Sequence, residues 1–253
     1  MIYDLQKASM LKRISAYILD LILLVILVTG CAALLSSVLH YDSYSDSLLD
    51  YYTKYETEYG TSFYYSEEDY NALPAEDQQK YDDAYAALIA DEDAMYVYNM
   101  LINLTLLMLS ISILVSYAVL EFIVPLLFKN GQTVGKKVFG VAVMRTGGVK
   151  ISTVSLFIRT FLGKFAIETM VPVLLLMMIF LNAIGVVGPA IILALLVVEV
   201  VLMVVTRTNS TIHDILSDTV TVDLSSQLIF GSEEELLEYK KKAAAEKAAR
   251  QDY

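Results

Sequence analysis

Long apolar segments alternate with polar ones along this chain of 253 residues. About 20 apolar residues in a helix span a hydrocarbon core roughly 30 Å thick, so segments of this length are candidate transmembrane helices. Four such segments cover residues 14–39, about 101–128, 165 to about 182, and 186–205. Gly185 and Gly188 lie in a turn-prone stretch between the last two, which favours a tight helical hairpin. The pattern predicts an all-α polytopic membrane protein with four transmembrane helices.

The long polar segment at residues 40–97 has a helical periodicity of its own. Apolar and aromatic residues recur at helical spacing in the series Tyr41, Tyr44, Leu48, Tyr51, Tyr55 and Tyr59. Pro74 is typical of the first turn of a second helix, and Gly60 lies at the expected break. Fifteen acidic residues against two lysines give this segment a net charge of −13, whereas the whole chain carries −11. We expect a small helical cap, either a solvated spacer or a platform that binds a cationic partner.

The next polar segment is basic. Its bases are Lys129, Lys136, Lys137, Arg145 and Lys150. Apolar residues that alternate on both sides of Gly147 and Gly148 predict a short β-hairpin. Residues 153–164 place apolar side chains on one face, which is typical of a helix in the headgroup region. The expected division is residues 1–39 (N-terminus and first span), 40–97 (acidic cap), 98–128 (second span), 129–164 (basic hairpin and interfacial helix), 165–206 (third and fourth spans) and 207–253 (tail with a charged helix).

The basic residues also predict the orientation in the membrane. Lys and Arg in short loops mark the cytoplasmic side, because they resist translocation. They cluster in the N-terminus, at Lys7, Lys12 and Arg13, and again in residues 129–150. We therefore expect a multi-pass protein of the cell membrane with cytoplasmic N- and C-termini, a cytoplasmic hairpin and an extracytoplasmic acidic cap.

Four acids lie within the apolar segments, where an unpaired charge costs at least ~2.5 kcal/mol. They are Asp20, Glu121, Glu168 and Glu199. At 1.5 Å of rise per residue they lie about 5 to 12 Å from the cytoplasmic ends of their helices, in roughly one layer. We expect supporting charge at the headgroups from Arg13, Arg159 and Lys164, with a local pair between Lys164 and Glu168 four residues later. Four carboxylates cannot all stay ionised in a dry bundle, so a proton or cation site is predicted. Ion pairs that merely fix helix register would give the same pattern.

Other kinds of site have little support in the sequence. Gly131 to Lys137 has three residues between its glycines and a second lysine in place of the hydroxyl, so it is not a phosphate-binding loop. One cysteine, Cys31, and two histidines cannot supply a zinc cluster. The sequence offers no clear nucleophile and base pair. We expect no enzymatic activity, cofactor, metal site or nucleic-acid partner.

Three short motifs stand out in separated parts of the chain. The first runs from Lys12 to Asp20, the second comprises Gly131, Thr133, Gly135, Lys136, Gly140, Val143, Gly148, Leu156 and Arg159, and the third runs from Ser210 to Val220 with His213 and Asp214. Together they resemble the RDD family of bacterial membrane proteins. The resemblance implies that the family's name-giving arginine and aspartates correspond to Arg13, Asp20 and Asp214. For Asp214, a cap or turn residue in the tail is the simpler interpretation.

The resemblance implies a multi-pass membrane protein for which transport, including cation and proton exchange, is the usual suggestion. With the layer of acids, it favours a transporter of a small ion or solute, coupled to protons or monovalent cations through intramembrane carboxylates. The alternative is a non-enzymatic assembly, scaffold or sensing protein that acts through the acidic cap, where a protein partner would bind, and through the charged tail. The sequence leaves the transported species and the oligomeric state open.

Overall fold

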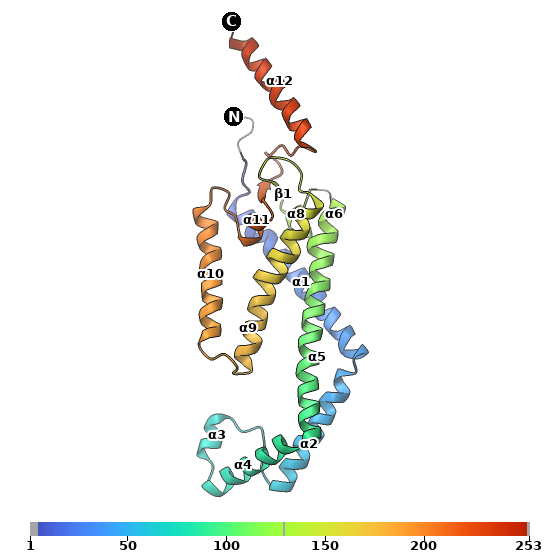
Figure 1. The fold of residues 1–253 in the computed structure, drawn as a ribbon, viewed down its shortest axis with the longest axis vertical. Coiled ribbons are helices and arrows are strands. Elements are labelled where there is room, and N and C mark those ends of the chain that lie inside the picture. The colour runs from blue at the N-terminus through green and yellow to red at the C-terminus, as the bar shows by residue number, and fades with distance from the viewer. Residues whose placement is uncertain (1–4, 129, 252–253) are drawn as a thin grey trace. The chain divides into compact units, whose positions relative to one another are not determined.

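The computed structural model describes residues 5–128 and 130–251 and is mostly helical. Four helical stretches are long and apolar enough to cross a membrane: Met10–Val38, Glu92–Phe128, Thr153–Phe180 and Val187–Val205. The predicted all-α polytopic class with four spans is confirmed. The chain divides into two compact units (Figure 1), and each is described by itself. Unit 1 is built from residues up to Val28 and from Ile113 onward, and unit 2 is Thr29–Ser112.

Unit 1 contains the whole of the third and fourth candidate membrane spans and part of the first and second. The first span is α1 (Met10–Val38), which ends in unit 2, and the fourth is α10 (Val187–Val205). The second span consists of α5 (Glu92–Tyr117), η1 (Ala118–Ile123) and α6 (Val124–Phe128). The third span consists of α8 (Thr153–Phe157), η2 (Ile158–Met170) and α9 (Val171–Phe180). α9 and α10 pack together as the predicted hairpin (Figure 1). Val25, Leu193 and Val204 are among many exposed apolar side chains, as expected for helices that face lipid.

The second span contains a π-helical segment, η1, directly before a proline. At its end the Val124 N–H donates to the Val119 C=O, five residues earlier. Pro125 cannot donate to the C=O of Glu121, and its ring clashes with that carbonyl, so the helix widens locally. The hydroxyl of Thr160 donates to the released Glu121 C=O at 2.8 Å. The widened turn is therefore tied to the neighbouring helix.

The third span repeats this arrangement in η2. Glu168 lies four residues before Pro172, and the Val171 N–H donates to the Ala166 C=O. The helix continues without a break from Thr153 to Phe180. The helix predicted at residues 153–164 is thus continuous with the third span. The bases of this segment pair with buried carboxylates within the protein, as described below.

A two-stranded antiparallel sheet lies in unit 1, formed by β1 (Val141–Arg145) and β2 (Thr219–Asp223). The register places Val141 opposite Asp223 and Arg145 opposite Thr219. The predicted hairpin partner after the glycine turn makes an isolated bridge between Met144 and Lys150, so the structure corrects the partner of β1. The reason is burial, because strand β2 contributes half of a shared core: Ala142, Met144, Val220 and Val222, with Leu5 and Ile229 against them.

Three further helices complete unit 1: α7 (Val134–Val138), α11 (Ile212–Leu216) and α12 (Glu233–Gln251). Thr133 caps α7 by accepting the Lys136 N–H, and Ser232 caps α12 by accepting the Glu235 N–H at 3.3 Å. Lys129, the first base of the predicted basic segment, lies outside the described residues.

Unit 2 consists of α2 (Tyr41–Tyr59), α3 (Glu67–Ala72) and α4 (Ala75–Ala90) with the adjoining parts of α1 and α5. Its core contains Tyr55, Leu88 and Ala94, with Tyr51, Tyr52, Tyr59, Phe63 and Ala87 packed against them. Asp91 caps α5 through the N–H groups of Asp93 and Ala94, and Tyr55 donates to its carboxylate at 2.8 Å. Residues 40–97 therefore form a helical unit in which tyrosines are the packing residues.

Candidate functional site

Asp214 joins two arginines from different helices. It is 1% exposed and pairs with Arg159 of η2 through one carboxylate oxygen and with Arg13 of α1, at 3.3 Å, through the other. Thr211 and Asp214 form a capping box at the start of α11. Arg13 also donates to the Asn209 C=O at 2.6 Å. The polar segment after the fourth span is therefore tied to α1 and η2, and Arg13 has its partners within the protein.

Glu121 is the centre of a second buried ion network. Lys164 of η2 donates to its carboxylate at 2.6 Å, and the Nζ of Lys136 in α7 lies 3.9 Å from the same oxygen. Lys136 also donates to the Thr133 hydroxyl at 3.3 Å. Lys164 therefore pairs across helices with Glu121, which corrects the expected local pair with Glu168. Because Lys136 is buried and engaged in this network, the structure gives no support to a nucleotide-binding role for it.

The π-helical geometry of η2 explains why its charged residues reach one site. Bonding between residues five apart places positions four to five residues apart above one another. Arg159, Lys164 and Glu168 are spaced in this way, and all three line the same cavity. With ordinary α-helical spacing these residues would drift around the helix.

Asp20 accepts two hydrogen bonds from the first turn of α7 and its N-cap residue. The Gly135 N–H donates to one oxygen at 2.7 Å, and the Thr133 hydroxyl donates to the other. A Cβ at Gly135 would lie 2.2 Å from the Ala16 carbonyl oxygen and 2.9 Å from the Asp20 carboxylate carbon. Glycine is thus required because the two backbones approach so closely. Asp20 acts here as a clamp between α1 and α7.

Glu168 pairs with His213, a partner that the sequence did not suggest. The His213 N–H donates to the carboxylate at 2.9 Å, and its ring Nδ1 lies 2.7 Å from the second oxygen. Gly163 makes room for this contact, since a Cβ there would lie 2.4 Å from the Cβ of His213. The contact joins η2 directly to α11.

Burial sets the charges of the groups outside the spans. Burial and then the nearby Arg159 lower the pKa of His213 to about 4, so the ring is neutral at pH 7 and its Nδ1–H donates to Glu168. Burial and then Lys164 lower the pKa of Lys136 to about 8, so it is still cationic at pH 7. Burial opposes ionisation of Asp214, but Arg159 outweighs it and holds the pKa of Asp214 well below its ordinary value.

A cavity of about 370 Å³ lies among these groups. Its acidic lining consists of Asp20, Glu168 and Glu199, and its apolar lining includes Met10, Ile14, Tyr17, Leu196 and Met203. Within the described part of the chain, both carboxylate oxygens of Glu199 are buried and have no hydrogen-bond partner. Three of the four predicted intramembrane acids therefore line one cavity, and the fourth, Glu121, pairs with two of its lysines.

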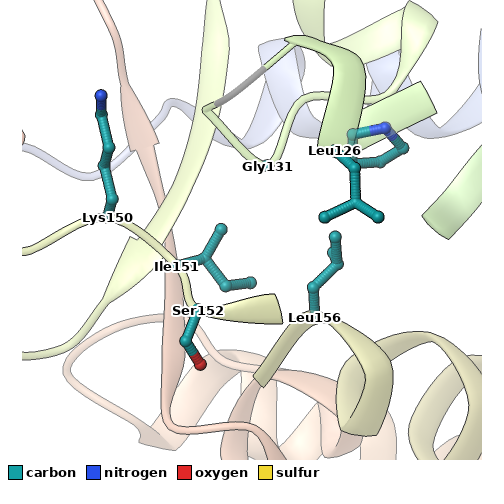
Figure 2. Close-up of a pocket in the computed structure, with 7 residues that line it drawn as sticks. Leu126, Gly131, Lys150, Ile151, Ser152 and Leu156 are labelled. Atoms are coloured by element: carbon teal, nitrogen blue, oxygen red, sulfur yellow. The ribbon is translucent and has the colours of Figure 1, made fainter. Parts of the chain in front are cut away.

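A second cavity, of about 290 Å³, lies beside α6 and α8. Figure 2 shows Leu126, Ile151 and Leu156 extending toward a common space, whereas the Lys150 side chain points away from it. Gly131 has φ +61°, and a Cβ on it would lie 2.9 Å from Ile151. This glycine serves a tight turn over an apolar space, and the cavity carries no acidic lining residue among those described.

The family model of RDD matches residues 7–218. The chain belongs to the RDD family. No curated protein and no solved structure matches the chain. In this RDD protein the three motifs meet at one site, because Arg13 and Arg159 share Asp214, and Asp20 binds Gly135. Helix α12 lies beyond the matched residues.

Sequence reasoning missed several members of the RDD site. It gave Lys136 and His213 no ion-pair partners and gave Thr133 and Thr160 no role. One signal was available, the repeated spacing Glu-x-x-x-Pro at Glu121 and Glu168, which marks both widened turns. In the described residues no three His, Cys, Asp or Glu side chains are arranged to hold a metal ion.

Proposed function

We propose that this RDD protein is a non-enzymatic transporter that exchanges a proton for a monovalent cation, with Glu199 as the carrying group. The observation that carries the proposal is that Glu199 is a lining residue of the cavity and that both of its carboxylate oxygens are buried without a hydrogen-bond partner among the described residues. A buried carboxylate in this state is costly unless it binds a proton or a cation. The other acids of the site already have partners.

The charge balance of the site supports a single exchanged charge. Five carboxylates belong to it, those of Asp20, Glu121, Glu168, Glu199 and Asp214. Four bases face them, Arg13, Lys136, Arg159 and Lys164, while His213 is neutral. One negative charge is left over, and it can be matched by one proton or one monovalent cation. The paired residues would hold the walls of the cavity, so Asp20 takes a positioning role in this proposal.

The test is cation-driven proton movement in vesicles that contain purified full-length protein. A pH indicator inside the vesicles reports protons that leave as cations enter. We expect Glu199→Gln to abolish exchange with little loss of folded protein, because the amide keeps the shape and needs no bound charge. Glu238→Gln in α12, an exposed acid, is the matched control and should exchange normally. Equal exchange by Glu199→Gln and wild type would disprove the role of Glu199, and no exchange by wild type would disprove the transport function.

We further propose that both termini and the basic segment are cytoplasmic and that residues 40–97 lie outside, on the basis of the Lys and Arg distribution. Replacing the single cysteine, Cys31, by serine allows labelling of introduced cysteines. Glu68→Cys is exposed in unit 2, and Gly147→Cys is exposed after β1, where a Cβ meets open space. In whole cells an impermeant thiol reagent should label the first variant. Labelling of the second variant alone would show that the topology is the reverse of the proposed one.

Unit 2 favours a second candidate function, the binding of a cationic protein partner. The supporting observation is that Tyr64, Tyr85 and Tyr96 are at least half exposed in a segment with a net charge of −13. Titration of purified protein with a short oligolysine tests this. We expect binding that weakens with salt and is reduced by Tyr64→Ser. Equal binding by wild type and Tyr64→Ser would show that charge alone causes the binding.

A further inference from the structure

We infer that the cation carried by Glu199 is organic, a monovalent ammonium or other onium ion with an apolar body. This inference rests on the proposed function of Glu199. The first argument is size, since the cavity measures about 370 Å³. One water occupies about 30 Å³ of liquid, so the space is roughly ten times larger than a small metal ion with a single water would need. It falls within the range of pockets for small organic ligands, about 300–1,000 Å³.

The second argument is the chemistry of the walls. Leu196, Glu199 and Met203 are spaced by three and four residues on α10 and so share one face. Helix α1 contributes Ile14 and Tyr17 to the lining. Apolar walls stabilise an apolar body by removing it from water, but they offer nothing to a bare ion, which would lose its hydration there. The aromatic ring of Tyr17 can also attract an onium charge.

The third argument is the number of available oxygens. Hard metal ions require about six or more oxygen ligands. The oxygens of Asp20 are occupied by the Gly135 N–H and the Thr133 hydroxyl, and those of Glu168 are occupied by His213. Glu199 is left with two oxygens that the described residues do not engage. Two oxygens suffice for one onium ion or one proton, and they do not make a coordination shell.

The exchange step conserves charge. When the onium ion enters, the carboxylic acid of Glu199 releases its proton to water, and the cation takes the place of that proton beside the carboxylate. No covalent bond to carbon changes. The stoichiometry is therefore one proton released for each cation bound.

The experiment uses purified full-length protein and tetraphenylphosphonium, which is permanently charged and apolar. Equilibrium dialysis measures binding, and a pH indicator in weak buffer measures proton release. We expect one site, with one proton released for each cation bound. Glu199→Gln should weaken binding about tenfold or more and abolish proton release. Leu196→Trp, which fills the cavity, should weaken binding several-fold, whereas Leu193→Trp on the same helix, also exposed but not lining the cavity, should not.

Competing cations separate the inference from the function on which it rests. Sodium and potassium lack an apolar body and should not displace the probe at a hundredfold excess. Proton release by sodium or potassium, without binding of the probe, would overturn the organic cation and leave proton exchange intact. Proton release by none of the cations would overturn both. Equal binding of the probe to wild type and Glu199→Gln would show unspecific uptake into apolar surface and overturn the inference.

Discussion

The two units of this protein use ionisable residues in opposite ways. In unit 1, Asp214, Glu121 and Arg159 are less than 10% exposed. Asp214 pairs with Arg159, and Glu121 pairs with Lys164 of a neighbouring helix. In unit 2 the acids Asp46 and Asp50 are exposed, and tyrosines fill the core. A buried charge needs a partner at close range, whereas water screens an exposed one. Unit 1 should therefore be sensitive to the loss of single charges, and unit 2 should tolerate such losses.

The largest effect is expected from Arg159→Met. It leaves Asp214 buried with Arg13 as its remaining arginine, and breaking a buried pair typically costs about 3–5 kcal/mol. Thermal unfolding in detergent should shift down by roughly 10 °C. Arg145→Met removes a partly exposed arginine that pairs with exposed acids and should cost less than about 1 kcal/mol. Similar shifts for both arginines would show that burial does not distinguish them.

A smaller loss is expected from Gly135→Ala. The new methyl would meet the Ala16 carbonyl oxygen at 2.2 Å, so α1 and α7 must separate and the bonds to Asp20 lengthen. Overpacking of this kind costs about 1–3 kcal/mol. Gly147→Ala is the control, because a Cβ there meets nothing within 4 Å. Denaturant unfolding measures the difference, and equal midpoints would contradict the close approach.

Two lysines sharpen the comparison through pH. Burial and then Lys164 lower the pKa of Lys136 to about 8, whereas the hydrogen bond that Lys54 donates to the Tyr55 hydroxyl raises the pKa of Lys54 above its ordinary value. Between pH 8 and 10 folded Lys136 loses its proton while the unfolded chain keeps it, so Lys136 makes the folded state more stable as pH rises. The gain should be on the order of 2 kcal/mol. Lys54 contributes stability below its unfolded pKa, and that contribution is lost as pH rises through the folded pKa.

Unfolding of Lys136→Met and Lys54→Met between pH 7 and 10 checks this prediction. Lys136→Met should lack the rise in stability that wild type shows, and Lys54→Met should keep it. If the stability of Lys136→Met rises by the same amount as that of wild type, groups other than Lys136 cause the pH dependence.

The smallest effects are expected in unit 2. Tyr55→Phe removes a hydrogen bond to Asp91 and should cost about 1 kcal/mol. Asp46→Asn and Asp50→Asn should each stay within about 0.5 kcal/mol, because both side chains are exposed. Chemical unfolding of the three variants gives the ranking. A larger loss for either aspartate than for the tyrosine would show that the surface acids of unit 2 hold its fold.

Local patterns in the chain were enough to predict much of the fold. The four spans, the intramembrane acids and the tyrosine-faced helices of residues 40–97 all follow from hydrophobic periodicity and length. These signals are readable because exposure to lipid or water acts on each residue separately, at the period of its own helix. Family membership was also visible in the motif around Arg13 and Asp20.

The pairing of these elements depended on contacts between residues far apart in the chain. Periodicity could not show that β1 pairs with β2, that Lys164 binds Glu121, or that Glu168 binds His213. A strand can pair with any other strand, and a charged side chain can pair with any side chain of opposite charge. Tertiary packing decides the pairing, because it determines which two segments lie close together. Glu199 shows the same limit, because the sequence could not reveal that its two carboxylate oxygens have no hydrogen-bond partner among the described residues.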